Sequence, residues 1–278
     1  MSISRPVRVC AYMAALFLVA AARPAAAQNA PQYNPASSNA ATGETYHIEG
    51  QAGLWSPSPA ITASSESLGI IGTNINFVTD LGITRTWFSD LRLTLRPAKK
   101  HKFRIEYIPI KYDAKKTLTR DLVFNGIRYK IGVPVTSSLD WKAWRFSYEY
   151  DFVYQPRWFV GAVVDVKYTD VTATLSSPVE TEYTHARAPI PAVGGIVRGY
   201  VVPNISITGE VTGFKLPSSI GGDNTGRYIE VDVYGTVNFT PNFGAVLGYR
   251  SLDVQFQTEN DAGDFKPRGL YFGGVARF

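Results

Sequence analysis

Cysteine and histidine are scarce in this chain of 278 residues, and charged residues make up only 18% of it. The single cysteine, Cys10, lies in an N-terminal segment that we predict to be cleaved off, so the mature chain carries no thiol. Disulfide bonds and cysteine metal sites are thereby excluded. A soluble domain usually has about 25% charged residues, so something other than a charged surface must surround this chain, of which 13% is aromatic.

The N-terminus has the features of a secretory signal peptide. A basic start precedes an apolar run over 9–22, which is shorter than the roughly 20 residues that a spanning helix needs. Ala25 and Ala27 fit the small-residue pattern before a cleavage site, which predicts a signal peptide over 1–27 and export of the chain. Cleavage removes three arginines and no acid, so the net charge falls from +5 to about +2. We therefore expect no nucleic-acid partner.

The rest of the chain divides into a leader and one all-β domain. Residues 28–43 are rich in Asn, Ala, Pro and Ser without apolar periodicity, which predicts disorder. Over 44–278 apolar residues alternate with a period of two, as in RYIEVDVYGTVNF, and no helical period explains this pattern. Ten strands are predicted, at 46–55, 87–96, 102–112, 139–152, 158–169, 192–202, 205–215, 227–239, 243–255 and 269–278.

The connections between these strands alternate between short and long. This alternation predicts a closed antiparallel β-barrel with tight turns at one end and long loops at the other. Asn125 and Gly126 are the predicted centre of a hairpin turn within the long connection 113–138. An even strand number returns both chain ends to the same side, so ten strands fit; weak alternation over 70–78 leaves twelve open, and the full range considered is eight to twelve.

The apolar face of the strands is predicted to contact lipid rather than a core. The polar faces carry mainly Tyr, Thr, Ser and Asn, whereas a soluble barrel would expose many Lys and Glu side chains. Glycine and alanine recur on the apolar face, where they would fill a core poorly. Aromatic residues gather where strands meet the short turns, as an interfacial girdle would: Phe152, Trp158, Phe239, Phe243 and Phe278.

The chain ends in LYFGGVARF, an alternating strand with a terminal phenylalanine. This ending resembles that of bacterial outer-membrane β-barrel proteins. The resemblance implies location in the outer membrane, with short periplasmic turns and long extracellular loops. It also implies that the barrel-assembly machinery recognises the last strand, through Leu270, Phe272, Gly274, Ala276 and Phe278. Lipid and lipopolysaccharide are the other expected partners, and Lys115, Lys116 and Arg120 are candidates for binding lipopolysaccharide phosphates.

Outward apolar faces direct the charged residues of the strands into the lumen. The predicted lumen residues are Asp90, Arg92, Arg96, Arg104, Glu106, Arg145, Glu149, Asp151, Asp165, Lys167, Arg198, Glu210, Glu230, Asp232 and Arg250. Their near balance of charge favours ion pairs that fill the barrel over a ring of one sign that selects ions. We expect Arg145, Glu149, Arg198, Glu230 and Asp232 to be members of this set of lumen charges.

Three functions remain open from the sequence. The first is a non-enzymatic barrel with a structural or surface-interaction role and a largely filled lumen. The second is a narrow channel for small solutes. The third is a hydrolase at the outer rim, for which His185, near Glu180 and Glu182, is the candidate base, although its spacing matches no metal-ligand motif. For the non-enzymatic barrel, no catalytic residue, metal or cofactor is predicted.

Overall fold

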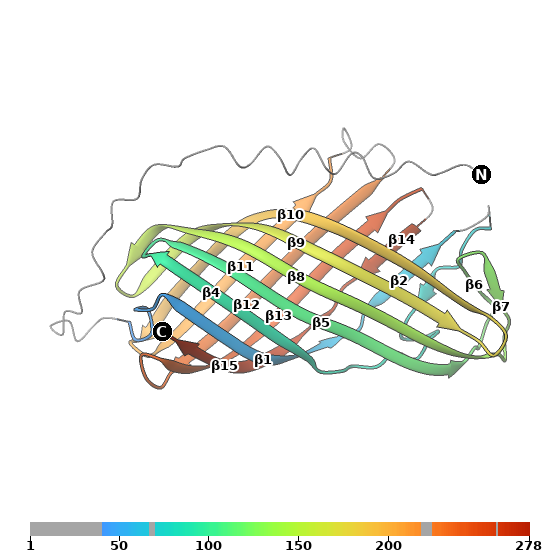
Figure 1. Cartoon of the computed structure of the whole chain (residues 1–278), viewed down its shortest axis with the longest axis horizontal. Coiled ribbons are helices and arrows are strands. Elements are labelled where there is room, and N and C mark those ends of the chain that lie inside the picture. The colour runs from blue at the N-terminus through green and yellow to red at the C-terminus, as the bar shows by residue number, and fades with distance from the viewer. Residues whose placement is uncertain (1–40, 67–69, 218–223, 260) are drawn as a thin grey trace. The chain divides into compact units, whose positions relative to one another are not determined.

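The computed structural model describes residues 41–66, 70–217, 224–259 and 261–278. The predicted signal peptide and the leader up to residue 40 lie outside the described residues. Every described element is a strand, and ten of these close into one antiparallel barrel (Figure 1). The barrel strands are β1 (Ile48–Ser58), β4 (Phe88–Ala98), β5 (His101–Thr117), β8 (Pro134–Gln155), β9 (Trp158–Ser176), β10 (Thr181–Val202), β11 (Ile205–Lys215), β12 (Thr225–Asn238), β13 (Phe243–Gln257) and β15 (Arg268–Arg277).

The first and last strands close the barrel. β1 pairs antiparallel with β15, and the other strands pair with their neighbours in chain order. Beyond the last strand, the carbonyl of Phe278 accepts hydrogen bonds from the backbone amides of His47 and Ile48, and the Phe278 amide donates to Ile48. The C-terminal residue therefore belongs to the closing seam. The prediction of a ten-stranded closed antiparallel barrel is confirmed.

Five short strands lie outside the barrel wall proper. β14 (Asp261–Phe265), β2 (Ile61–Ser65) and β3 (Ile75–Asn76) extend the sheet beyond β13. β6 (Leu122–Phe124) and β7 (Ile127–Tyr129) form a separate hairpin. Asn125 and Gly126 connect them with φ values of 49° and 83°, the left-handed conformation that such a two-residue turn requires. The predicted hairpin inside a long loop is thus present.

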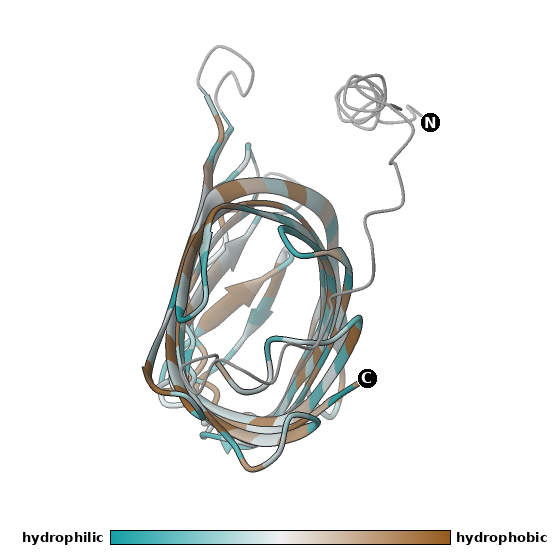
Figure 2. Cartoon of the chain, turned by 90° about the vertical axis from the view of Figure 1, so that its left-hand side faces the viewer, coloured by the Kyte–Doolittle hydropathy of each residue, from teal (hydrophilic) through white to brown (hydrophobic). Residues whose placement is uncertain are grey.

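Apolar side chains cover the outside of the barrel. In Figure 2, which looks along the barrel from the end with the short turns, hydrophobic and hydrophilic bands alternate around a closed ring. Val233 is 48% exposed whereas its neighbour Asp232 is 1% exposed, so successive side chains point to opposite sides of the wall. We call the end with the short turns the turn end and the end with the long loops the loop end. No helix in the described part of the chain is long and apolar enough to cross a membrane.

Two rows of aromatic side chains bound the outward apolar band. Near the turn end, Phe152, Trp158, Phe239, Phe243 and Phe278 are all exposed. Toward the loop end, Tyr107 and Trp144 stack with ring centroids 4.3 Å apart, and Tyr168 is the register partner of Trp144 on β9. The first row is the girdle that the sequence predicts; the second was not predicted.

The side of the wall that is apolar changes along the longest strands. Between Trp144 and Phe152 on β8, apolar residues face outward and charged residues inward. Between Pro134 and Lys142 the order reverses, because Leu139 and Trp141 are buried while the outward positions are polar. β5 reverses in the same way after Tyr107. The barrel therefore has a charged interior behind its apolar band and an apolar interior at the loop end.

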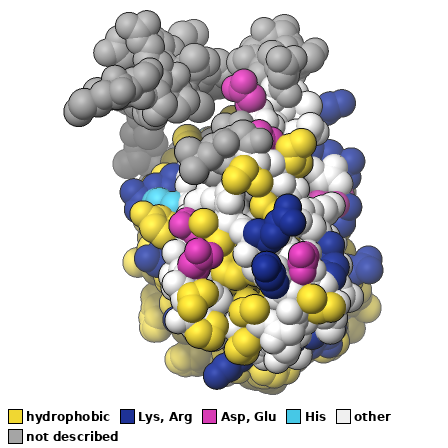
Figure 3. Space-filling model, turned by 90° about the vertical axis from the view of Figure 1, so that its right-hand side faces the viewer, with side chains coloured by type: hydrophobic (Ala, Val, Ile, Leu, Met, Phe, Trp, Pro, Cys, Tyr) yellow, Lys and Arg dark blue, Asp and Glu magenta, His cyan; other side chains and the backbone are white. Residues whose placement is uncertain are grey.

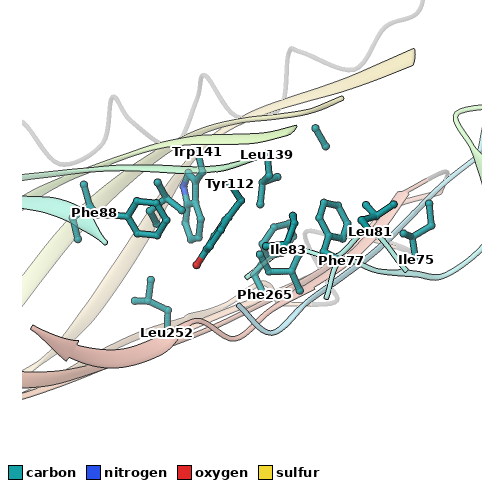
Figure 4. Close-up of a cluster of buried hydrophobic side chains, with 14 of the residues drawn as sticks. Ile75, Phe77, Leu81, Ile83, Phe88, Tyr112, Leu139, Trp141, Leu252 and Phe265 are labelled. Carbon is teal, nitrogen blue, oxygen red and sulfur yellow. The ribbon is translucent and has the colours of Figure 1, made fainter. Parts of the chain in front are cut away.

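The apolar interior at the loop end is filled by a segment of the connection between β2 and β4. Residues 75–83, which we call the plug segment, bring Ile75, Phe77, Leu81 and Ile83 against the inner faces of the strands. Figure 4 shows these side chains between the two walls, beside Tyr112 and Leu139. We call the space that they share with the walls the outer chamber. Its wall residues include Phe88, Ile108, Ile110, Tyr112, Leu139, Trp141, Leu252 and Phe265.

The N-terminal residues of the described chain cross the turn end. The amides of Ala41 and Thr42 donate to the carbonyls of Pro156 and Pro203, which lie in two different short turns. Gly43 has a φ of +86°, a backbone conformation that residues with a side chain rarely adopt, so this position favours glycine. Residues 41–43 belong to the predicted disordered leader, yet here they are hydrogen-bonded to the barrel.

Candidate functional site in the barrel interior

The structure places all fifteen predicted lumen residues inside the barrel, and all are buried. They come from β4, β5, β8, β9, β10, β11, β12 and β13, at positions where the strand alternation directs side chains inward. Most of them form one continuous set of ion pairs, which we call the central lumen network. Its members are Asp90, Arg92, Lys102, Arg104, Glu106, Arg145, Glu149, Asp151, Asp165, Lys167, Glu210, Glu230, Asp232 and Arg250.

Arg145 is a centre of this network because it contacts four carboxylates. Its guanidinium lies 2.9 Å from Asp165, 3.6 Å from Glu230 and 3.8 Å from Glu106, and it also pairs with Glu210. These acids belong to four other strands. One guanidinium therefore cross-links five strands through the interior, and its planar fork of five donors suits this arrangement.

Arg250 is a second centre, on the opposite part of the wall. It lies 2.6 Å from Glu106, 3.3 Å from both Asp90 and Asp232, and 3.6 Å from Glu230. Glu106 and Glu230 are thus shared between Arg145 and Arg250. Through these shared acids the network spans the lumen from β8 and β9 to β13.

The network continues toward the turn end through Arg104 and Lys102. Arg104 lies 2.7 Å from Glu210 and 3.4 Å from Glu149, and Lys102 lies 2.6 Å from Glu149. Glu149 is therefore connected to Arg145 through Arg104 and Glu210. Asp232 accepts a hydrogen bond of 2.8 Å from the Tyr271 hydroxyl and pairs with Arg92 and Arg250.

Arg198 lies apart from this network, in a group near the turn end. Its guanidinium is 2.9 Å from the Glu44 carboxylate and donates to Thr208 and to the Tyr234 hydroxyl. The Phe159 ring separates the two sets of charges, with the Lys102 ammonium 3.7 Å and the Arg198 guanidinium 5.4 Å from its centroid. The sequence identified Arg198 as inward but not its partner, Glu44.

Glu44 connects the N-terminal segment to this group. Besides Arg198, its carboxylate contacts Arg96 at 3.4 Å and accepts a hydrogen bond of 2.7 Å from Tyr200. Burial by itself would raise the pKa of the Glu44 carboxyl, but Arg198, Lys102 and Arg96 outweigh it and lower the pKa to about 2. Glu44 is therefore ionised and holds residues 41–47 across the turn end.

Four inward-pointing charged residues of the strands and of the N-terminal segment are missing from the predicted set: Glu49, Lys102 and Arg277, which are buried, and Glu44, whose side chain is 10% exposed. The signal for three of them was present, because each stands an even number of positions from an inward residue of its own strand. Lys102 precedes Arg104 by two, and Arg277 follows Tyr271 by six. Glu44 precedes β1, so strand alternation gave no signal for it.

A smaller polar cluster fastens the plug segment at the loop end. Arg120 donates to both carboxylate oxygens of Asp80, at 3.0 and 2.5 Å, and to the carbonyl of Asn74 at 2.8 Å. The Lys116 ammonium donates to the carbonyl of Thr79. We call these contacts the plug latch. The hydrogen bonds from Arg120 lower the pKa of the Asp80 carboxyl below its ordinary value, although partial burial opposes them.

The three histidines lie on or near the outer surface. His185 Nε2 is 2.8 Å from Asp170, which also accepts a hydrogen bond from Arg187. Neither Glu180 nor Glu182 contacts His185 among the interactions of the described residues; Glu182 accepts a hydrogen bond from Asn125. His101 contacts the Tyr148 hydroxyl at 2.7 Å, and His47 contacts the Arg96 carbonyl. Within the described residues, no group of three His, Cys, Asp or Glu side chains is arranged to hold a metal ion.

The fold has clear relatives although the sequence does not. No family model and no curated protein matches this chain. Among solved structures, the outer membrane protease OmpT from Escherichia coli superimposes with a TM-score of 0.58 at 9% identity, covering 84% of this chain and 97% of OmpT. The fold is that of a bacterial outer-membrane β-barrel. At this identity the likeness shows the fold and nothing of the activity.

Two other solved barrels match more loosely. The toluene transporter TodX of Pseudomonas putida has a TM-score of 0.38 at 8% identity, covering 87% of this chain and 93% of TodX. The attachment invasion locus protein Ail of Yersinia pestis has a TM-score of 0.35 at 7% identity, covering 84% of this chain and 99% of Ail.

Because the outward apolar band requires lipid, the barrel lies in the outer membrane, with the turn end in the periplasm and the loop end outside the cell.

Proposed function

We propose that this chain is a non-conducting, non-enzymatic outer-membrane barrel with a role in envelope structure or surface interaction. The observation that carries the proposal is the central lumen network. Ion pairs cross-link the wall from several sides at the depth of the outward apolar band, where a channel would need an open path. Barrels of about eight strands are filled by side chains, and ten strands enclose only a little more space.

Two further features obstruct the barrel interior and support the same function. The plug segment fills the outer chamber with apolar side chains, and the N-terminal residues cross the periplasmic end. Figure 3 shows the extracellular end, where Lys, Arg, Asp and Glu side chains lie among apolar ones over the surface that grey atoms leave visible. A solute would have to displace all three obstacles, so surface interaction suits the molecule better than transport.

We further propose outer-membrane lipid, lipopolysaccharide and the barrel-assembly machinery as partners. Leu270, Phe272 and Phe278 are exposed on the outer surface of β15 or directly after it, where a partner can reach them; Gly274 shares this face and Ala276 is partly exposed. Among the predicted phosphate-binding cations, Lys116 and Arg120 are engaged in the plug latch. Lys115 is exposed and is the better candidate for lipopolysaccharide.

Planar-bilayer recording tests the absence of conduction. Refolded full-length protein, whose folding is verified by a heat-modifiable band on a gel, is expected to give no steady single-channel current above the boiled control. Steady unitary currents from the folded protein would overturn the proposal in favour of a narrow channel. Surface hydrolysis that disappears in a His185→Ala variant would instead favour the rim hydrolase.

A further inference from the structure

The outer chamber differs from an ordinary β-sheet core in what fills it. Its walls are the inward faces of β4, β5, β8, β13 and β14, and they are apolar at the depth where the outside of the barrel is polar. The plug segment is bound to these walls through apolar contacts, whereas its specific polar contacts with the long loop 118–133 and β5 are those of the plug latch. Arg120 is the exposed member of the latch, with 46% of its side chain exposed, whereas Asp80 is buried, so the latch borders water on the Arg120 side and can open toward it.

Two polar groups of the outer chamber have no hydrogen-bond partner among the described residues. They are the Tyr112 hydroxyl and the Trp141 indole N–H, on residues that are only 2% and 3% exposed. Buried donors of this kind are rarely left unpaired in folded proteins. These two donors are therefore available to an acceptor that enters the chamber.

Both groups belong to side chains that project into the chamber. Figure 4 shows the Tyr112 and Trp141 rings side by side, with Phe88 on one side of the pair and Ile83 on the other. Tyr112 contacts the Phe88 ring edge-on at 5.0 Å between centroids, and Trp141 contacts Phe265 edge-on at 6.0 Å. The surroundings are thus apolar and aromatic, with two donors and no charge of the central lumen network among them.

We propose that the outer chamber is a binding site for a small apolar molecule that carries one hydrogen-bond acceptor, such as a carbonyl group. The apolar part replaces plug side chains against the chamber walls, and the acceptor receives hydrogen bonds from Tyr112 and Trp141. A carbonyl oxygen has two lone pairs and can accept both. Entry is from the extracellular side, because the central lumen network closes the other side of the chamber.

The test uses full-length protein in lipid nanodiscs and two probes of equal length, 2-octanone and octane. Isothermal titration, corrected with empty nanodiscs for partitioning into lipid, is expected to show saturable 1:1 binding of 2-octanone at least tenfold tighter than any binding of octane. Combined Tyr112→Phe and Trp141→Phe substitutions remove both donors and keep an aromatic ring at each position, although Phe is smaller than the indole of Trp141. They are expected to abolish the preference for the ketone.

A matched control is available on the same two strands. Tyr107→Phe combined with Trp144→Phe makes the same chemical changes on the outward face of β5 and β8, and is expected to leave the ketone preference unchanged. A second variant, Arg120→Ala, opens the plug latch and is expected to raise the association rate of 2-octanone about tenfold. Absence of saturable binding to the folded protein and to this unlatched variant would overturn the proposal, as would an unchanged preference in the donor-free variant.

Discussion

Val233 and Asp232 are adjacent residues that meet opposite environments. Val233 faces lipid, and Asp232 is held by Arg92, Arg250 and Tyr271. Val233→Arg is expected to cost about 2 to 4 kcal/mol of unfolding free energy, because the charge would lie near the middle of the apolar band. Val233→Leu, which keeps the lipid contact, is the control and should be nearly neutral. Urea unfolding of the refolded barrel in lipid vesicles measures both.

Asp232→Ala tests the inward side of the same strand. The substitution removes one of the two carboxylates that the buried Arg92 and Arg250 share, the other being Glu106, which is expected to cost about 3 to 5 kcal/mol if little water enters the site. A loss of stability much smaller than that of Val233→Arg would mean that water screens the lumen charges.

Asp80 makes the plug latch sensitive to acid. The pKa of the Asp80 carboxyl is lower in the folded protein than its ordinary value of about 4. The ionised carboxylate therefore stabilises the folded plug above that ordinary value. This stabilisation is lost as the pH falls through the lower pKa of the folded state. Hydrogen exchange in residues 75–83 is expected to quicken, relative to the intrinsic rate, below about pH 4. In Asp80→Asn the exchange should be fast at neutral pH as well. If hydrogen exchange of residues 75–83 in the wild type, relative to the intrinsic rate, did not change with pH across this range, the role of the latch would be contradicted.

At the scale of single strands, the sequence predicts where each strand lies better than how far it extends. The pattern over 139–152 identifies β8 and its lipid face, but β8 begins at Pro134. β10 begins at Thr181, although its prediction begins at 192. The missed start of β10, Thr181–Pro191, has no buried residue, and the missed start of β8 buries only Val135 and Ser137. A stretch without an apolar face has no period of two for the sequence to reveal, so the predicted strand ends where the apolar face ends.

The plug segment could not be predicted for a different reason. Weak alternation over 70–78 suggested an additional wall strand, but only Ile75–Asn76 is a strand there, and the apolar residues fill the chamber instead. What places them is contact with strands far away in the sequence, such as β5, β8 and β14. The local alternation of apolar residues in the sequence carries no information on such long-range contacts. For the same reason the sequence identified Arg198 as a lumen residue without its partner Glu44.

The last strand carries a prediction about assembly. Removal of Phe278 takes away an outward aromatic side chain and the carbonyl that receives the amides of His47 and Ile48. We expect folded, heat-modifiable protein in the outer membrane of cells to fall severalfold, because the proposed recognition end and one anchor of the girdle are lost. Refolding of the purified variant in detergent should be affected far less. Normal outer-membrane levels of the truncated protein would contradict the assembly role.

At the scale of the whole molecule, the interior is organised as three successive layers. The N-terminal segment and Glu44 close the periplasmic end, the central lumen network fills the level of the bilayer, and the plugged outer chamber stands outside the membrane. Each layer uses the interaction suited to its surroundings: ion pairs where the outer surface is already apolar, and an apolar core where the outer surface meets water. Under the proposed function, we expect loss of the plug alone to leave the barrel closed by the ion pairs of the central lumen network.

Arg145 is the residue at which the filled lumen and a channel predict opposite results. Arg145→Ala leaves Glu106, Asp165, Glu210 and Glu230 short of one shared cation. If the network is dry, the melting temperature of the detergent-folded barrel should fall markedly and conductance should stay near zero, because uncompensated buried charge is costly. In a wet pore, salt would screen the same charges, so stability would change little and the reversal potential would shift. Arg187→Ala, which removes an arginine from the outer surface, is the control and should change neither quantity. An unchanged melting temperature together with a shifted reversal potential would replace the closed barrel with a channel.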